Sequence, residues 1–428
     1  MQWGRKRVNY GGRPSALIAG RKRDANVRVR KRLDIGWRDL FWGASWTCLP
    51  FGHFGVQRHV EETWSHADDT LICLSVRSGL DLLLETLQFP PKSEVLISAL
   101  TIPDMARIVQ FHDLVPVPVD LDVGTAAPNE ESLRRAMSPA SRAVLVAHLF
   151  GARIPMEPIL AVAKDHGLLV IEDCAQAFDG GQYHGHPESD VAMFSFGPIK
   201  TATALGGGVL RVRDPELLRR MRERQADYPL QGRLTYLRRV MKYAMLKAIS
   251  SRPIFTVLTG FWSMVGYDYD RFVNRQTRGF PGPEFFRRIR QQPSTPLLAV
   301  LERRLRRYDR RRLQRRTSHG QLLVRLFEDK VVCPGAVVGA HVHWVFPILV
   351  ENPEAVIAAL RKAGFDATQG QSMATVAPPV DRPEVAPRQA ANVLAKMVYL
   401  PIYPEMPERA IRKMAEVVLS LAQRPRFL

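Results

Sequence analysis

Two hydrophobic periodicities alternate along the chain between about residue 74 and residue 212. Leu80, Leu83, Leu84 and Leu87 recur at the helical spacing i, i+3, i+4 and i+7, which predicts an amphipathic helix over 79–88. Short apolar runs predict β-strands over 94–97, 115–119, 143–147, 168–171 and 193–196. Because strands that alternate with helices form largely parallel sheets, this region predicts an α/β domain with a mostly parallel sheet flanked by helices.

One strand–helix–strand unit in this region is complete. The strand over 143–147 is followed by a helix over 158–164 with proline in its first turn, and Gly167 ends that helix. The next strand, 168–171, runs into the acidic pair Glu172-Asp173. Open α/β sheets bind ligands at the carboxyl ends of their strands, so the pair lies where a ligand would bind.

The rest of the chain divides by composition. Residues 1–35 are rich in arginine and glycine and lack periodicity, which predicts a basic, disordered arm before the large α/β domain over 36–212. Residues 213–328 predict an Arg-rich helical insertion with a connecting helix, and residues 329–428 predict a small α+β domain. The expected elements of that last part are a strand over 344–349, with Pro347 indicating a sheet edge, and helices over 353–363 and 407–422.

Charge and cysteine content narrow the class of protein. The 428 residues carry a formal charge of +19, so the surface is expected to attract the phosphates of nucleotides, nucleic acids or anionic lipids. No helix-turn-helix, zinc-ligand or RNA-binding pattern accompanies this charge, so neither a specific nucleic-acid partner nor a metal site is predicted. Four scattered cysteines, no signal peptide and no run of ~18 apolar residues predict a cytoplasmic protein.

Three features, each weak alone, carry the candidate chemistry. Residues 77–79 (Arg-Ser-Gly) begin a helix, where backbone N–H groups either bind a phosphate or are simply capped. Asp173 either keeps a pyridinium nitrogen protonated or caps the next segment. Lys200 ends the motif FSFGPIK after a strand and precedes three glycines, 206–208, which allow close backbone approach. A lysine there is placed to form a Schiff base, although a single lysine is usually a solvated surface residue.

The order of these motifs resembles the DegT/DnrJ/StrS family of sugar aminotransferases, which depend on pyridoxal 5'-phosphate (PLP). Over 71–212 the chain reads VRSGLDLL, EVLISALTIPDM with PVPVDLD, AHLFG, EDCAQA and FSFGPIK, which are five motifs in the family's order and spacing. Weaker similarity extends to LERRLRRYDRRR and YLPIYPEMPERAI. The resemblance implies a fold-type-I enzyme that binds PLP and forms a homodimer with active sites at the subunit interface.

The resemblance also implies roles for individual residues. Lys200 would bind the cofactor covalently and move the proton between substrate and cofactor, and Asp173 would pair with the pyridine nitrogen. The other implied cofactor contacts are Gln176 on the side of the phenolic oxygen, with Ser195 and the Ser78-Gly79 turn on the phosphate. His148 would lie near the substrate pocket or would be a packed, hydrogen-bonded side chain.

The chain departs from the family pattern at several positions. Leu80 replaces a threonine that would contact the phosphate, and Arg77 replaces a serine or asparagine and would supply positive charge instead. Ile102 replaces an aromatic residue that would stack on the cofactor ring, and Gly206 replaces an acidic residue. No Asn-Arg-Met segment is recognisable near 287–292. The presence of Lys200 and Asp173 favours PLP chemistry. The departures at the other positions indicate a substrate that differs from the usual one of the family.

The leading hypothesis is a cytoplasmic, homodimeric PLP-dependent aminotransferase. It would move an amino group from an amino-acid donor such as glutamate to a keto group of a nucleotide-linked sugar or a similar anionic acceptor, in pathways such as polysaccharide biosynthesis. The arginine-rich run over 303–316 would be a solvated helix face whose field attracts that acceptor.

Two further hypotheses follow from the basic insertion and from the altered pocket. The basic amphipathic helix over 236–249 and the apolar run over 254–267 would place the enzyme at the inner face of an anionic membrane, where it would act on a lipid-linked substrate. The same helix would otherwise be a lid or a dimer contact. In the last hypothesis the fold is kept as a catalytically inactive binding or regulatory module.

Overall fold

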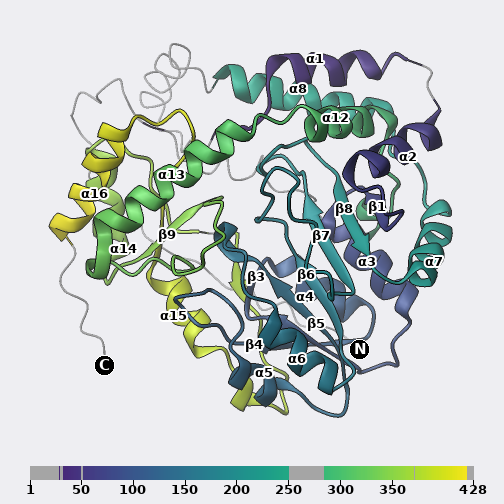
Figure 1. Cartoon of the computed structure of the whole chain (residues 1–428), viewed down its shortest axis with the longest axis horizontal. Helices are drawn as coiled ribbons and strands as arrows, with labels where there is room; N and C mark the ends of the chain where they lie inside the picture. Colours follow the sequence, from purple (N-terminus) through teal and green to yellow (C-terminus); the bar gives the residue numbers. More distant parts are fainter. Residues whose placement is uncertain (1–27, 29–31, 50–51, 250–283, 371, 422–428) are drawn as a thin grey trace, which may run out of the picture.

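The structure is a computed structural model that describes residues 28, 32–49, 52–249, 284–370 and 372–421 (Figure 1). A large α/β layer structure holds the first half of the chain, and a smaller group of helices and strands lies beside it. The long helix α13 (Arg310–Phe327) runs from one part to the other. The predicted apolar run over 254–267 and most of the predicted arm over 1–35 lie outside the described residues.

A seven-stranded sheet forms the centre of the large part, in the order β1-β8-β7-β6-β5-β2-β4. The five strands from β7 to β4 pair in parallel, whereas β8 pairs antiparallel with both β7 and β1. The strands are β1 (Thr70–Cys73), β2 (Glu94–Ser98), β4 (Val115–Val119), β5 (Ser141–Ala147), β6 (Leu169–Asp173), β7 (Val191–Ser195) and β8 (Gly208–Val212). The mostly parallel sheet is confirmed. Strand β8 was missed by the sequence prediction because its glycines suggested a loop.

Alternate side chains of each strand enter cores on opposite faces of the sheet. Leu71 and Cys73 face one core, and Ile72 and Leu74 face the other. The first core is covered by α3 (Val76–Leu87), α4 (Pro103–Phe111), α7 (Pro215–Ala226) and α11 (Phe285–Ile289). The opposite face is covered by α1 (Trp37–Trp46), α2 (His53–Trp64), α8 (Arg233–Ile249), α12 (Thr295–Arg306), α5 (Glu130–Ala136) and α6 (Glu157–Asp165). Helices on both faces confirm the predicted fold class.

Helix α3 begins three residues earlier than its leucine pattern predicts. The hydroxyl of Ser75 accepts a hydrogen bond from the backbone N–H of Ser78 at 3.1 Å and so caps the helix. The helix ends at Leu87, and its C-cap residue Gln88 has a left-handed φ of 50°. The capped first turn brings Arg77 and Ser78 onto the helix, beside the carboxyl edge of the sheet.

Helix α8 packs through a stripe that only partly matches the predicted apolar positions, which were Leu237, Val240, Met241, Ala244, Met245 and Ala248. Tyr236, Val240 and Tyr243 are the buried side chains, whereas Met241 and Met245, which the pattern assigned to the apolar face, are 60% and 53% exposed. The described part of 213–328 contains α7, α8, α11, α12 and α13. Among the described residues no helix is long and apolar enough to span a membrane.

The smaller part has a core formed by α13, α14 (Pro353–Lys362), α16 (Glu408–Leu421), β9 (Phe346–Leu349) and β11 (Met397–Leu400), whereas α15 (Arg388–Lys396) packs against the large part. Strand β9 pairs antiparallel with β11, and Pro347 lies in this two-stranded sheet, in agreement with its predicted edge position. Strand β10 (Ala374–Thr375) pairs with β3 (Leu100–Thr101) to join the two parts. The 3-10 turns are η1 (Leu149–Gly151), η2 (Glu328–Lys330) and η3 (Pro383–Val385).

Within the predicted arm, the described residues contact the rest of the protein. The backbone N–H of Arg28 donates to Gly364 O at 2.8 Å, and Asp34 forms ion pairs with Arg304 and Arg312. Ile35 is buried in the same core as α1 and α12. This end of the arm is therefore fixed against α12 and α13.

Candidate active site

Lys200 and Asp173 both lie at the carboxyl edge of the sheet, near enough to interact electrostatically. Strand β6 ends at Asp173, its parallel neighbour β7 ends at Ser195, and a turn closed by the Lys200 N–H to Gly197 O brings the lysine back to that edge. The carboxylate of Asp173 accepts a 2.9 Å hydrogen bond from the backbone N–H of Ala175. Burial raises the pKa of Asp173, although this hydrogen bond and the charge of Lys200 oppose the increase.

The amine of Lys200 is unusually acidic for a lysine. Burial lowers its pKa to about 8, with Asp173 opposing the shift and Arg77 adding to it. A lysine with that pKa is deprotonated to about a tenth at pH 7. The indole ring of Trp344 lies over the amino group, with Nζ 4.2 Å from the ring centroid. Lys200 is therefore a shielded amine of which a useful fraction is nucleophilic near neutral pH.

The start of α3 lies beside this pair and carries positive charge. Arg77 lowers the pKa of both Asp173 and Lys200, which places its guanidinium near them, and it forms a 2.6 Å ion pair with Asp104. A Cβ atom added at Gly208, which pairs with Ser195 across β7 and β8, would lie 2.6 Å from the backbone carbon of Ser75. Gly208 therefore lets β8 touch the start of α3, as predicted for the glycine run.

The other residues of the predicted phosphate site are positioned as follows. The backbone N–H of Ser78 is used by the Ser75 cap, and its hydroxyl lies 2.9 Å from that of Ser75. A Cβ atom added at Gly79 would lie 2.6 Å from Leu210, so this glycine serves helix–sheet packing. Leu80 is fully buried in the core rather than directed at the sheet edge. Arg77, the Ser78 hydroxyl and Ser195 thus remain as the phosphate-binding candidates.

His148 and Glu172 form a buried polar pair beneath the edge. Both side chains are fully buried, and His148 Nε2 lies 2.8 Å from the Glu172 carboxylate. Because His148 Nδ1 accepts a hydrogen bond from Ile154 N–H, Nε2 carries the proton and donates to Glu172. Burial raises the pKa of Glu172, but the hydrogen bonds from His148, Ser189 and Tyr183 outweigh it and lower the pKa to about 2. The geometry assigns His148 to packing rather than to an open pocket.

Gln176 and Ile102 lie at turns that border the edge. Gln176 Oε1 accepts a 2.8 Å hydrogen bond from the N–H of Phe150, whose φ of 62° is left-handed, so its amide stabilises the η1 turn after β5. Ile102 is the N-cap residue of α4 and packs, partly buried, against the core on the α3 side. Trp344 was missed by the sequence prediction, although the strand predicted over 344–349 begins with it.

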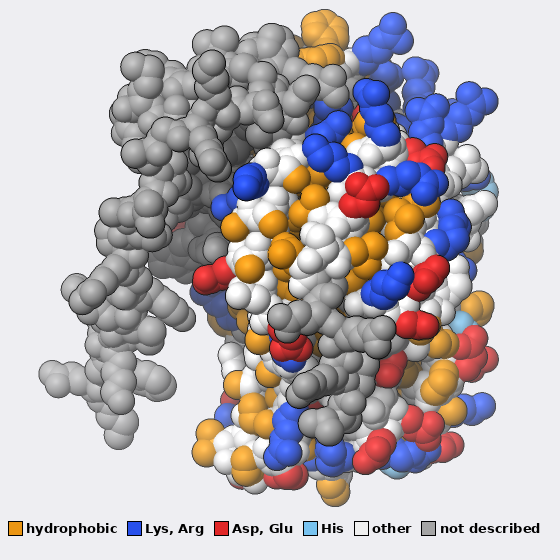
Figure 2. Space-filling model, turned by 90° about the vertical axis from the view of Figure 1, so that its left-hand side faces the viewer, with side chains coloured by type: hydrophobic (Ala, Val, Ile, Leu, Met, Phe, Trp, Pro, Cys, Tyr) orange, Lys and Arg blue, Asp and Glu red, His pale blue; other side chains and the backbone are white. Residues whose placement is uncertain are grey.

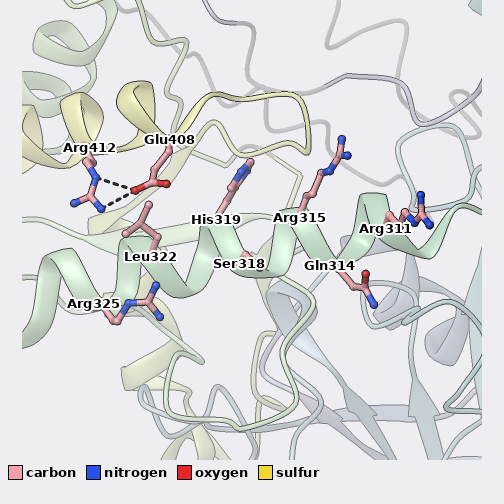
Figure 3. A pocket seen from close by; sticks show the side chains of 9 residues that line it. All are labelled: Arg311, Gln314, Arg315, Ser318, His319, Leu322, Arg325, Glu408 and Arg412. Carbon is pink, nitrogen blue, oxygen red and sulfur yellow. Dashed lines mark hydrogen bonds and ion pairs between the residues drawn. The ribbon is translucent and has the colours of Figure 1, made fainter.

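A broad groove lies away from these residues. It has a volume of about 640 Å³ and lies between α13 and α16 (Figure 3). Its lining is basic, with Arg311, Arg315 and Arg325 along α13, while Arg412 of α16 is paired with Glu408. Figure 2, which shows the side of the molecule that carries α13 and α16, shows Lys and Arg side chains gathered toward its top. Neither Lys200 nor Asp173 lines this groove.

A second groove of about 550 Å³ lies closer to the sheet edge. It is bordered by Gly151 and Arg153 after η1, by Asp179 in the loop after β6, and by Arg310 and His341. Asp179 and Arg153 form an ion pair at 3.6 Å. Neither Lys200 nor Asp173 lines it, so chemistry and not groove size locates the candidate active site.

Comparison with known proteins agrees with this geometry. A model of the DegT/DnrJ/EryC1/StrS aminotransferase family matches residues 62–239. A UDP-N-acetyl-3-dehydro-alpha-D-glucosamine 3-aminotransferase of Acidithiobacillus ferrooxidans is 37% identical over 154 residues, which are 35% of this chain and 42% of that protein. A GDP-perosamine synthase of Caulobacter vibrioides is 31% identical over 194 residues, which are 42% of this chain and 52% of that protein. The chain thus spans about half or less of the length of these relatives.

The fold similarity extends further than the sequence similarity. The crystal structure of a DegT DnrJ EryC1 StrS aminotransferase from Brucella abortus matches with a TM-score of 0.65 at 18% identity, covering 90% of this chain and 95% of that one. The segment over 62–239 contains β1 to β8, with both Lys200 and Asp173. That segment matches the DegT/DnrJ/EryC1/StrS aminotransferase family, whose aminotransferases are PLP-dependent.

Proposed function

We propose that this chain is a PLP-dependent aminotransferase that moves an amino group from an amino-acid donor, glutamate, to the keto group of a nucleotide-linked sugar. The observation that carries the proposal is the placement of Lys200 and Asp173 at the carboxyl edge of the sheet, near enough for the charge of each to shift the pKa of the other. Lys200 contributes an amine covered by Trp344, and Asp173 contributes a partly buried carboxylate. Positive charge for a phosphate lies beside them on Arg77.

The donor set of this edge fits PLP. Asp173 would pair with the ring nitrogen, Lys200 would bind the aldehyde carbon, and Arg77 with the hydroxyls of Ser78 and Ser195 would hold the phosphate. When bound, PLP supplies an electron sink for the negative charge left when the substrate loses its α-proton. Ile102 is aliphatic, so it would contact the pyridine ring of PLP by van der Waals packing and not by aromatic stacking.

Lys200 is suited to hold and move that proton. Its pKa of about 8 lies near neutral pH, where a general acid–base catalyst is most effective because both protonation states are populated. The indole of Trp344 covers the amine and limits the access of water. Asp173 stays in the strand end where the backbone N–H of Ala175 fixes its orientation.

The acceptor class rests on the relatives and on charge. The two relatives described above are named for UDP- and GDP-linked sugars. A formal charge of +19 would attract the diphosphate of such a substrate by long-range electrostatics. We also propose a homodimer, as the family resemblance implies, and a place in sugar or polysaccharide biosynthesis in the cytoplasm.

The test is the visible absorption spectrum of the purified protein with PLP, before and after L-glutamate is added, with Lys200→Ala as the control. We expect a PLP band in the wild type that glutamate bleaches and that the variant does not form. Borohydride reduction followed by peptide mass spectrometry should place the cofactor on Lys200. If saturating PLP gives no band, the fold is a binding or regulatory module instead.

A second candidate, action on a lipid-linked acceptor at a membrane, is favoured by an exposed apolar face. Helices α1 and α8 lie side by side and antiparallel, because Lys247 lies over the ring of Trp37 and Arg233 donates to Leu49 O. Their outward side chains are large and apolar, with exposed fractions of 55% for Trp37, 75% for Phe41, 66% for Leu234, 60% for Met241 and 53% for Met245.

Basic residues are interspersed on the same helices. Arg38 on α1 and Arg238 on α8 are exposed next to these apolar side chains. Exposed tryptophan, phenylalanine and methionine among arginines is the composition of helices that lie on anionic lipid, where each basic residue contributes about 1 kcal/mol. A second copy of this basic chain would bring like charges together, so we propose an anionic membrane as the partner of this face.

Co-sedimentation with vesicles tests this second candidate. Wild-type protein should bind phosphatidylglycerol vesicles and not phosphatidylcholine vesicles, and Phe41→Ser with Met241→Ser should weaken binding at least tenfold. The matched control is Val337→Ser with Val380→Ser, which removes apolar side chains that are 72% and 101% exposed elsewhere. If the protein binds neither kind of vesicle, or if the double variant instead converts a dimer into monomers, the lipid proposal fails.

A further inference from the structure

The loop that carries Lys200 is held in an unfavourable backbone conformation. Ala202 has a φ of 53° and Leu205 a φ of 62°, both in the left-handed region that residues with a Cβ atom rarely adopt. Each such residue costs roughly 1–3 kcal/mol and persists only where surrounding structure enforces it. Within the loop, Thr203 contributes by donating to Phe196 O and accepting from Leu205 N–H.

Three side chains from distant parts of the chain also hold this loop. Trp344 Nε1 donates to Ile199 O at 3.2 Å, and Arg316 Nη1 donates to Thr201 Oγ1 at 3.1 Å. The carboxylate of Asp34 accepts from Ala202 N–H at 2.9 Å. The residues immediately before and after Lys200 are thus both held by side chains outside the sheet domain. We call Asp34, Arg316 and Trp344 the lysine clamp.

The clamp residues are themselves fixed. Arg316 also donates from Nε to Val342 O at 2.9 Å, which ties α13 to the segment that carries Trp344. Asp34 is paired with Arg304 and Arg312, the latter at 3.2 Å. Burial raises the pKa of Asp34, but Arg304 and the Ala202 N–H outweigh it and leave the pKa lowered, so the carboxylate stays charged. The clamp is therefore rigid enough to set the loop's shape.

Arg316 is unfavourable for stability, which argues for a further role. It is only 8% exposed, its Nη2 has no hydrogen-bond partner among the described residues, and burial lowers its pKa. No ion pair within 4 Å compensates it in the described part of the chain. The charge of Asp34 offsets this burial only in part, without a direct ion pair. Burying a guanidinium in this way costs stability, and an apolar side chain of similar volume is often better tolerated. Arg316 is placed where its hydrogen bonds reach the residue next to Lys200.

We propose that Asp34, Arg316 and Trp344 are positioning residues that fix the direction of the Lys200 amine. The inference rests on the proposed function, because it takes Lys200 as the cofactor lysine. All three residues lie outside the segment 62–239 that matches the family model. Trp344 also covers the amine from one side, and the charged groups that face it from the other elements are Asp173 and Arg77.

The first test needs no cofactor. Apo-protein is treated with an amine-reactive acetylating reagent over a range of pH, and modification of the Lys200 peptide is followed by mass spectrometry. We expect a midpoint near 8 in the wild type. In Trp344→Leu and Arg316→Met the loosened loop admits water, so the midpoint moves up toward the usual lysine value of about 10.4. Arg316→Lys, which keeps charge and one donor, should restore part of the shift.

The second test separates positioning from folding. We expect kcat to fall roughly 10- to 100-fold in Trp344→Leu and Arg316→Met while KM for glutamate changes little, because a misplaced reacting group slows the chemical step. Trp42→Phe is the matched control. Trp42 also donates its Nε1–H to a backbone carbonyl, Ala299 O at 3.3 Å, and an arginine lies over its ring, but the acceptor is in α12 and not in the lysine loop. This control variant should leave the midpoint and kcat unchanged.

The outcomes distinguish the clamp from the proposed function. If Lys200 of the wild type never binds PLP, the function fails whatever the variants do. If Lys200 binds PLP but both Arg316 variants and Trp344→Leu keep the wild-type midpoint and kcat, the clamp is overturned. In a double variant of Arg316 and Trp344, kcat should fall by less than the product of the two single fold-losses, because both residues hold the same loop. A fall equal to that product would contradict a shared action.

Discussion

Arg77 and Asp104 form a 2.6 Å ion pair between α3 and α4, at the point where the sheet edge meets the start of α3. The pair is partly exposed, with side-chain exposures of 24% and 31%, so its guanidinium is both oriented and reachable by a ligand. Arginine binds phosphate with paired, charge-assisted hydrogen bonds. We therefore propose that Arg77 supplies positive charge in place of the hydroxyl that is absent at Leu80.

Arg77→Gln should therefore weaken PLP binding about tenfold, the loss expected for one charge-assisted hydrogen bond of about 1.5 kcal/mol. Asp104→Asn should leave PLP binding as tight or tighter, because it removes the competing carboxylate and keeps Arg77. Dissociation constants from PLP titrations measure both effects. If both variants bind PLP more weakly by the same factor, the Arg77–Asp104 ion pair orients α4 and Arg77 does not bind the phosphate.

The pKa of Lys200 should control how fast the apo-protein takes up PLP. Since burial lowers that pKa to about 8 and Asp173 raises it, Asp173→Asn should lower it further and leave more neutral amine at pH 7. We expect Asp173→Asn to bind PLP at least as fast as wild type at pH 7 while losing transamination at least 100-fold. Stopped-flow absorbance across pH 6–10 measures the uptake rate, and slower uptake in the variant would contradict the assignment.

The His148–Glu172 pair should make stability depend on acid pH. Hydrogen bonds hold the pKa of Glu172 at about 2, below its usual 4.5, so this carboxylate contributes stability that is complete above pH ~4.5 and is lost as the pH falls toward 2. Glu172→Gln should destabilise the protein by a few kcal/mol at pH 7, and the difference should shrink below pH 4.5. Denaturant unfolding at pH 7 and pH 3.5 measures it, and a constant difference would refute the charge argument.

Two glycines near the lysine offer a matched comparison. A Cβ atom at Gly208 would lie 2.6 Å from the backbone carbon of Ser75, whereas at Gly197 the nearest atom would be Ser195 Oγ at 3.7 Å. Gly208→Ala should push β8 away from α3 and cost on the order of 1–3 kcal/mol together with PLP affinity. Gly197→Ala should be tolerated in both respects. Thermal unfolding and PLP titration measure the two variants, and equal tolerance would mean that α3 can shift.

The sequence predicted local elements well because their signals are local. The leucines of α3 and the apolar runs of β2, β4 and β5 report burial directly, and the motifs around Asp173 and Lys200 lie on consecutive strands of one sheet. Strand β8 begins in a glycine run, so its place between β7 and β1 could not be read from propensity. The exposed stripe of α8 could not be predicted either. Met241 and Tyr243 both carry large side chains that a core could accept, and packing against α1 and α12 determines which of them is buried.

The clamp residues escaped prediction for a different reason. Trp344 binds a residue 145 positions away and Arg316 one 115 positions away, and no local pattern encodes such contacts. Arg316 lies in a run of arginines that suggests a solvated face. Only the fold distinguishes the buried arginine from its exposed neighbours.

That separation along the chain has a consequence for biosynthesis. Lys200 leaves the ribosome well before Arg316 and Trp344 exist, and at 5–20 residues per second the delay is on the order of ten seconds. During that interval the strained loop lacks two of its three outside supports, so the nascent chain should not yet react with PLP as the finished protein does. PLP would then bind efficiently only after the whole chain has been synthesised, and truncated chains would remain without the cofactor.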